Sequence, residues 1–126
     1  MNDSELRLQQ KADQVVNEIG GAIEQLLTDL NASRLNSTGN IPPVEFEKHH
    51  VRWSLDWKAN SISFRLRVAI RLMDDGSVAR VDQVIVQKEA WTAYDFEGHT
   101  PTTTMKQIAT MDIGKIRDAV NALWGN

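Results

Sequence analysis

The strongest constraint on the fold is an unbroken alternation of apolar and other residues between Ile62 and Leu72. Successive side chains of a β-strand point to opposite faces of a sheet, so this period of two predicts a strand with one buried side. The segment from Val51 to Trp57 alternates in the same way, and the short polar stretch 58–61 joins the two segments. Together they predict an antiparallel hairpin. Its buried face is expected to carry Val51, Trp53, Leu55, Trp57, Ile62, Phe64, Leu66, Val68, Ile70 and Leu72.

The clearest turn signal is the stretch 74–77, which reads Asp-Asp-Gly-Ser. Asp-Gly favours the two central positions of a type I′ hairpin turn, because both positions need a positive φ. This turn would place Leu72 opposite Ala79, and Leu66 opposite Ile85, in a third strand over about 78–92. In that register Val81 and Ile85 join the buried face. The opposite face of the third strand then carries Arg80, Asp82, Val84, Val86 and Lys88.

The N-terminal segment from about 4 to 30 has apolar residues at steps of three and four, which predicts a long amphipathic helix. Gly20-Gly21 in its middle disfavours a helix by roughly 1 kcal/mol per glycine relative to alanine. The pair therefore suggests a kink or a close contact with another backbone. We expect this helix to cover the sheet. A near-heptad run leaves open pairing with a second copy of the helix; it consists of Leu8, Ala12, Val15, Ile19, Ala22 and Leu26.

The remaining segments complete an α+β pattern. Residues 31–43 are polar, end in two prolines and predict a loop. The first strand is expected over about 44–57, with a bulge near His49-His50 because Val44 and Phe46 are out of phase with Val51. Residues 102–110 suit either a strand or a helix, and 112–124 predicts a helix capped by Asp112.

The chain is therefore expected to fold as one domain over 1–126. It would consist of a long N-terminal helix, an antiparallel meander of three or four strands, and a C-terminal helix packed on one face of the sheet. The chain has 126 residues, no cysteine and a formal net charge of −3. The polar, acidic start does not resemble a secretory signal, and no apolar run reaches the roughly 20 residues that cross a bilayer. We expect a cytoplasmic protein that does not contact membranes.

Basic residues gather on the face of the sheet opposite the predicted core. The expected register places Arg71 opposite Arg80 and Arg52 opposite Arg67, although like charges that face each other across a ladder are unfavourable. An anion between them would relieve the repulsion, so this face is a candidate binding surface. A solvated face without a ligand, and a sheet or dimer contact that includes Val84 and Val86, remain alternatives. The candidate binding residues are Arg52, Arg65, Arg67, Arg71, Arg80 and Lys88.

No pattern in the chain predicts a catalytic, metal or cofactor site. His49 and His50 are adjacent, so on a strand they would point to opposite faces and would not share a metal ion. An enzyme would need a cleft near His99, Asp95 and Glu97, which is a thin basis for acid–base catalysis.

The sequence thus favours a non-enzymatic interaction protein that binds another macromolecule stoichiometrically, as an inhibitor, immunity protein, chaperone or adaptor does. The expected partner is a protein with an acidic patch, and a homodimer through the long helix or the sheet would fit. The alternative is a binder of an anionic ligand, such as a nucleotide, a short nucleic acid or a phosphorylated metabolite, on the basic face.

Overall fold

The two alternating segments form neighbouring antiparallel strands in the computed structural model, which describes residues 2–92 and 102–125. They are β2 (His50–Ala59) and β3 (Ile62–Asp74), and the turn between them has a positive φ at both Asn60 and Ser61. The apolar residues of both strands face the same side and are largely buried, with Trp53 only 2% exposed. The predicted hairpin and its buried face are confirmed.

Three further strands extend the hairpin on both sides. They are β1 (Glu45–Glu47), β4 (Ala79–Trp91) and β5 (Thr102–Ile108), and the order β1-β2-β3-β4-β5 makes a simple antiparallel meander. The sheet therefore has five strands, compared with the three or four predicted. The ambiguous segment is a strand at 102–108, which agrees with the preference of its β-branched threonines.

The predicted first strand is divided by a tight turn. Lys48 and His49 have φ values of 50° and 67°, so the chain reverses there and forms the β1–β2 hairpin. Phe46 then pairs with Val51 and shares its face. A two-residue turn, and not the expected bulge, corrects the phase difference between the two apolar runs.

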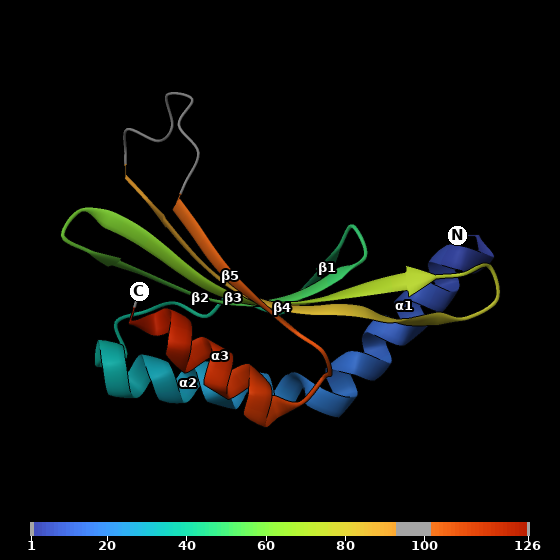
Figure 1. Cartoon of the computed structure of the whole chain (residues 1–126), viewed down its shortest axis with the longest axis horizontal. Helices are drawn as coiled ribbons and strands as arrows, with labels where there is room; N and C mark the ends of the chain where they lie inside the picture. Colours follow the sequence, from blue (N-terminus) through green and yellow to red (C-terminus); the bar gives the residue numbers. More distant parts are fainter. Residues whose placement is uncertain (1, 93–101, 126) are drawn as a thin grey trace.

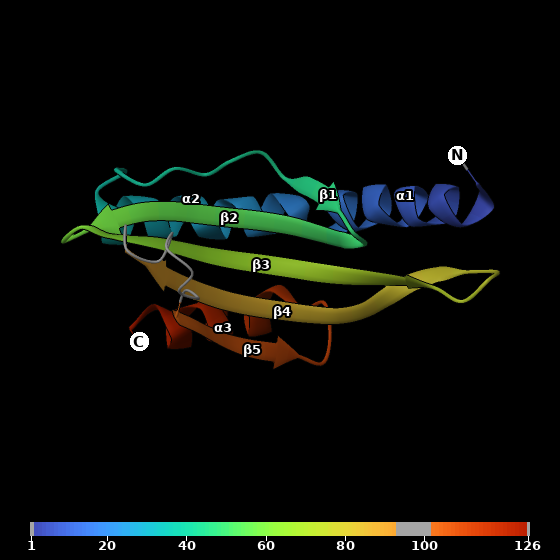
Figure 2. The same ribbon diagram turned by 90° about the horizontal axis from the view of Figure 1, so that it is seen from above.

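Two helical segments cover a single face of the sheet (Figures 1 and 2). The N-terminal helix consists of α1 (Asp3–Val15), the π-helical η1 (Val16–Gly20) and α2 (Gly21–Leu35), and it ends at Asn36 in a left-handed conformation. It thus begins at residue 3 and ends at residue 35, five residues beyond the predicted end. Its sheet-facing residues Leu8, Ala12, Val15 and Ile19 are buried in the core, so the near-heptad seam is not free to pair with a second helix.

The π-helical segment keeps one side of this helix directed at the sheet. Leu8 and Leu27 are both buried and lie 19 residues apart, whereas five turns of α-helix take about 18 residues. A π-turn absorbs one extra residue, so the apolar stripe does not rotate away from the sheet. At this point Gly20 packs beside Trp53, and Figure 1 shows the helix bending between α1 and α2. The expected kink is present, but the neighbour at Gly20 is the Trp53 side chain and not another backbone.

The C-terminal helix α3 (Ile113–Trp124) lies beside α2 on the same face (Figure 1). Asp112 caps it, because its carboxylate accepts a hydrogen bond of 3.0 Å from the Lys115 backbone N–H. Trp124 at its end stacks on Trp57 with ring centroids 4.6 Å apart, and Trp57 stacks on Phe64 at 5.3 Å. This aromatic cluster joins α3 to the β2–β3 hairpin.

The pairing of β3 with β4 differs from the register expected for a two-residue turn. The loop spans residues 75–78, since Asp74 pairs with Ala79, and the Asp75 carboxylate accepts hydrogen bonds from the backbone N–H groups of Ser77 and Val78. A register shift between Arg71 and Leu72 adds one more residue to β4. Leu72 therefore pairs with Val81, and Leu66 pairs with Lys88. A net shift by an odd number of residues reverses the two faces of a strand.

An ion pair fastens the start of α1 to the end of β3. Arg7 donates through Nε and Nη2 to the two carboxylate oxygens of Asp74, at 2.7 and 2.8 Å. The Asp74 side chain is only 6% exposed, and the hydrogen bonds from Arg7 hold its pKa well below the usual range. This two-point contact ties together segments that are 67 residues apart in the sequence.

The first prediction compares the two adjacent glycines. Gly21 is exposed and a Cβ there would contact nothing within 4 Å, so Gly21→Ala should stabilise the fold by about 1 kcal/mol. A Cβ on Gly20 would lie 3.5 Å from the Trp53 ring, so Gly20→Leu should destabilise by about 2 kcal/mol through overpacking. Urea denaturation of both variants measures these changes. Equal effects of the two substitutions would contradict the packing of Gly20 on Trp53.

The second prediction concerns the acid dependence of the Arg7–Asp74 pair. The pKa of Asp74 is lower in the folded protein than its ordinary value of 3.8, so its carboxylate stabilises the fold above that value and less as the pH falls further. Asp74→Asn should lower the melting temperature at pH 7, and the difference from wild type should shrink below about pH 4. Asp29→Asn, at an exposed helical position, is the control. A difference that does not change with pH would contradict the pairing.

Candidate functional site

The candidate site is the open face of the sheet, which we define as the side that α1–α2 and α3 do not cover. Figure 1 shows the ends of the strands rising away from α2 and α3, so this face is concave in that view. Alternation and register assign its residues. They are Glu45, Glu47, His50, Arg52, Ser54, Asp56, Lys58, Ser63, Arg65, Arg67, Ala69, Arg71, Met73, Arg80, Gln83, Ile85, Gln87, Glu89, Trp91, Thr103, Met105 and Gln107.

Arg65 is held in place by a carboxylate on the neighbouring strand. Its Nε and Nη2 donate to the two oxygens of Asp56 at 2.8 and 3.2 Å, and the carboxylate raises the pKa of Arg65. The guanidinium also lies 5.9 Å from the ring centroid of Trp91 on β4, within the range of a cation–π contact. Arg65 therefore has a fixed position and a compensated charge.

Arg67 occupies the middle of the open face, between Ser54 and Gln87 in the register. Its side chain is 17% exposed, and its Nη1 lies 3.8 Å from Glu89 Oε1, too far for a good hydrogen bond. Its Nε is buried and has no hydrogen-bond partner among the described residues. Burial lowers the pKa of Arg67, and the Glu89 carboxylate opposes that effect. This guanidinium keeps unused donor capacity.

Two more arginines of the open face have acidic neighbours. Arg71 Nε lies 3.6 Å from Asp82 Oδ2, and Asp82 sits where the register of β4 shifts. Arg80 Nη2 lies 3.0 Å from Asp75 Oδ2 in the β3–β4 loop. Arg71 remains half exposed, at 51% of its side-chain surface. The face predicted to be basic is thus a mosaic of both signs.

The register corrects two expected contacts between like charges. Arg71 pairs with Gln83, and Met73 is the residue that pairs with Arg80. Arg52 pairs with Ala69 on β3 and with Glu45 on β1. These arginines therefore do not face each other directly across a ladder, although Arg52 is a diagonal neighbour of Arg67 and helps to lower its pKa.

Lys88 lies on the helix-covered side, contrary to its predicted position on the basic face. Its Nζ donates a hydrogen bond of 2.9 Å to the carbonyl oxygen of Trp124 at the end of α3, and lies 5.4 Å from the Phe64 ring centroid. Burial lowers its pKa. Val84 and Val86 share this side and are buried, so they cannot form the apolar part of an outer contact. The odd register shift in β4 accounts for all three corrections.

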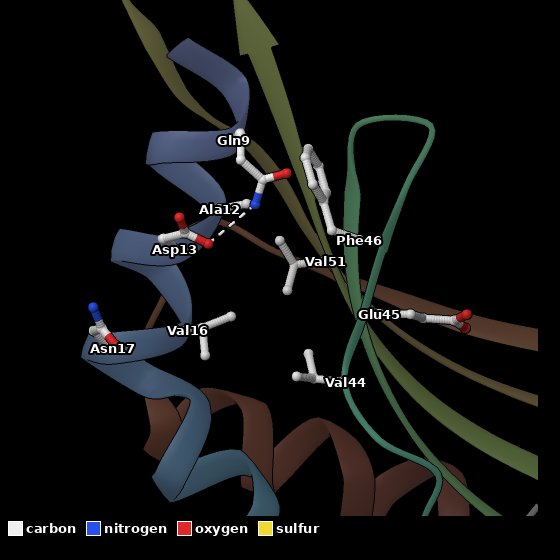
Figure 3. A pocket seen from close by; sticks show the side chains of 9 residues that line it. All are labelled: Gln9, Ala12, Asp13, Val16, Asn17, Val44, Glu45, Phe46 and Val51. Atoms are coloured by element: carbon white, nitrogen blue, oxygen red, sulfur yellow. Dashed lines mark hydrogen bonds between the residues drawn. The ribbon is translucent and has the colours of Figure 1, made fainter. Parts of the chain in front are cut away.

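A groove of about 520 Å³ lies on the helix side of the sheet, between α1–η1 and the β1–β2 hairpin. In Figure 3, Val16 and Val44 face the space between helix and hairpin from opposite sides, while Glu45 points away from it. Ala12 and Val51 are both buried, and Gln9 and Asp13 add polar groups on the helix. Its volume lies in the range of small-molecule pockets, and its lining combines apolar side chains with polar ones.

The second concavity, of about 430 Å³, lies near the β2–β3 turn. Trp57, Phe64 and Trp91 supply its aromatic surface, and Asp56 and Arg65 supply charged groups. The lining of this concavity therefore includes the Asp56–Arg65 ion pair of the open face and two rings of the aromatic cluster between α3 and the sheet. Sequence reasoning did not predict either concavity, because each is formed by segments that are distant in the chain.

The histidines do not come together as a ligand set. Burial lowers the pKa of His50, and its Nδ1 lies 2.9 Å from the Lys48 carbonyl oxygen, while His49 is part of the β1–β2 turn. Across residues 2–92 and 102–125, no three side chains of His, Cys, Asp or Glu lie close enough to hold a metal ion. The alternative centred on His99, Asp95 and Glu97 lies outside the described residues.

The geometry defines a class of structure, an α+β domain with helices on one face of an antiparallel sheet and a charged, concave open face. Comparisons of the chain with family models, with curated proteins and with solved structures found no match. Within the described residues, no helix combines the length and apolar character needed to cross a membrane.

The third prediction tests which side of the sheet Lys88 occupies. Lys88→Glu would place a carboxylate against the Trp124 carbonyl oxygen in a buried setting, so it should destabilise the fold by about 3 kcal/mol. Lys58→Glu is the matched control, since Lys58 is exposed on the open face, and it should change the stability by less than about 0.5 kcal/mol. Chemical denaturation measures both. Similar small effects would instead favour an outward-facing Lys88.

Proposed function

We propose that the protein is a non-enzymatic interaction module that binds another protein stoichiometrically through the open face of its sheet. The observation that carries the proposal is the arrangement of this face: arginines held by carboxylates of neighbouring strands, on a sheet that the described helices cover from the other side only. Roles as an inhibitor, chaperone, immunity protein or adaptor all use such a surface. A cytoplasmic location, expected from the sequence, belongs to the same proposal.

The charge pattern favours a protein partner over a small anion. Arg65, Arg71 and Arg80 each have a carboxylate within 4 Å, which reduces the local positive potential that a free phosphate would need. A protein surface of mixed charge can instead complement both the guanidinium and the carboxylate groups. Arginine, tryptophan and methionine, which are enriched in interfaces, are present as Arg71, Trp91 and Met73.

The test compares two charge reversals of the same kind. Arg71→Glu alters an exposed part of the open face, whereas Arg117→Glu alters an exposed position on the opposite side, on α3. The wild-type chain should retain a partner in a fixed molar ratio from native extract. The dissociation constant should rise by about 30-fold or more for Arg71→Glu, as for an interface hot spot, and stay unchanged for Arg117→Glu.

Two results would count against this function. One is the absence of any stoichiometric partner for the wild-type chain under native conditions. The other is equal binding by both variants, which would place the contact away from the open face. Circular dichroism of the two variants serves as the control for folding.

A specific observation supports an anion binder as the second candidate. The buried Nε of Arg67 lacks a hydrogen-bond partner among the described residues, and Arg52 lies next to it across the open face. An anionic ligand on these two guanidinium groups would bind more weakly as salt rises. Calorimetric titration with inorganic phosphate and with a nucleotide, repeated on Arg67→Ala, tests this candidate. Binding that Arg67→Ala leaves unchanged would exclude it.

A further inference from the structure

The two edges of the sheet are protected to different degrees. At one edge, β1 pairs with residues 50–52 of β2, and Asn40 exchanges two backbone hydrogen bonds of 2.8 Å with Asp56. Pro42 and Pro43 lie in the chain between these two contacts, and proline has no N–H to offer to a further strand. The β1–β2 edge is therefore blocked against pairing with another chain.

The other edge is open along seven residues. In the part of the chain that the structure describes, β5 has one neighbouring strand, β4. All side chains from Thr102 to Gln107 are exposed, and Met105 is 59% exposed. The strand contains three β-branched threonines, no proline, no carboxylate and a single charge at Lys106. Such an edge is a template for an added strand.

We propose that β5 pairs with β5 of a second copy of this chain, antiparallel and about a two-fold axis at Met105. This register pairs the whole strand and places no two charges opposite each other. Met105 then faces Met105 of the second copy, Thr104 faces Lys106, and all seven residues of each strand are paired. Centring the axis on Lys106 would instead oppose two like charges and leave two residues of each strand unpaired.

The two-fold symmetry of the β5–β5 contact determines how the sheets and helices of the two copies are arranged. A two-fold axis perpendicular to the sheet keeps the helices of both copies on one side and produces an isologous interface. The two sheets then join into one sheet of ten strands, with a continuous open face. Thr103, Met105 and Gln107 point to that face, and Lys106 lies on the helix side, where its long side chain can reach solvent past Thr104. This pairing does not depend on what the open face binds.

The absence of cysteine from the chain permits a direct covalent test. Residues directly opposite in an antiparallel pair have Cα atoms about 4.5–5.5 Å apart, which suits a disulfide. Met105→Cys should therefore give a covalent dimer under mild oxidation of the purified full-length chain. Val78→Cys, 57% exposed in the β3–β4 loop and outside β5, is the matched control and should form no disulfide-linked dimer under the same conditions.

Charge reversal provides a second and reversible test. Sedimentation of the wild-type chain should give twice the monomer mass. Met105→Lys and Met105→Glu should each sediment as a monomer with an unchanged circular dichroism spectrum, and an equimolar mixture of the two should recover the dimer. A monomeric wild-type chain, a dimer that survives both substitutions, or equal cross-linking of Met105→Cys and Val78→Cys would overturn the proposal.

Discussion

The pairing of β3 with β4 is the interaction on which the rest of the structure depends. It is the longest ladder in the sheet, and it decides which residues of β4 lie under the helices. Val84, Val86 and Lys88 enter the core because a four-residue loop and one extra residue together shift the register by an odd number. The same shift brings Glu89 and Trp91 to the open face, where they meet Arg67 and Arg65. The register of β4 therefore determines both which residues enter the core and which residues line the candidate site.

The parts of the fold that could be predicted are those governed by local periodicity. The alternation from Ile62 to Leu72 and the stripes of the two helices each require only that one side be buried. The register of β4 could not be predicted, because Asp-Gly suits a two-residue turn as well as the loop closed by the Asp75 carboxylate. The bulge near Leu72 has no residue pattern of its own. The candidate arginines of β2 and β3 therefore lie on the predicted face, whereas Lys88 lies on the opposite one.

The carboxylates beside the arginines of the open face have two physical effects. Carboxylates from β2, β4 and the β3–β4 loop lower the net charge around the arginines, so nonspecific attraction to polyanions is reduced. Asp56 and Asp75 also hold the guanidinium groups of Arg65 and Arg80 in position, which would lower the entropy that a partner of the proposed kind must overcome on binding. Arg65 illustrates both effects, since Asp56 holds it at two points and Trp91 supports its face. If the open face binds a protein, as proposed, it would select partners by shape and by the order of its charges.

The two faces and the two edges of the sheet differ in how far other segments of the chain cover them. The helices bury one face of the sheet, and the prolines and the short strand β1 protect the β1–β2 edge. Among the described residues, the open face and the β5 edge are the two parts of the sheet that remain uncovered. The β5 edge has no proline and, of the usual devices against strand addition, only the single charge of Lys106. A two-fold axis at Met105, as proposed, would let a second copy pair with all seven residues of this strand. If two copies join there, their open faces form one surface, and a partner bound across the junction would contact both chains.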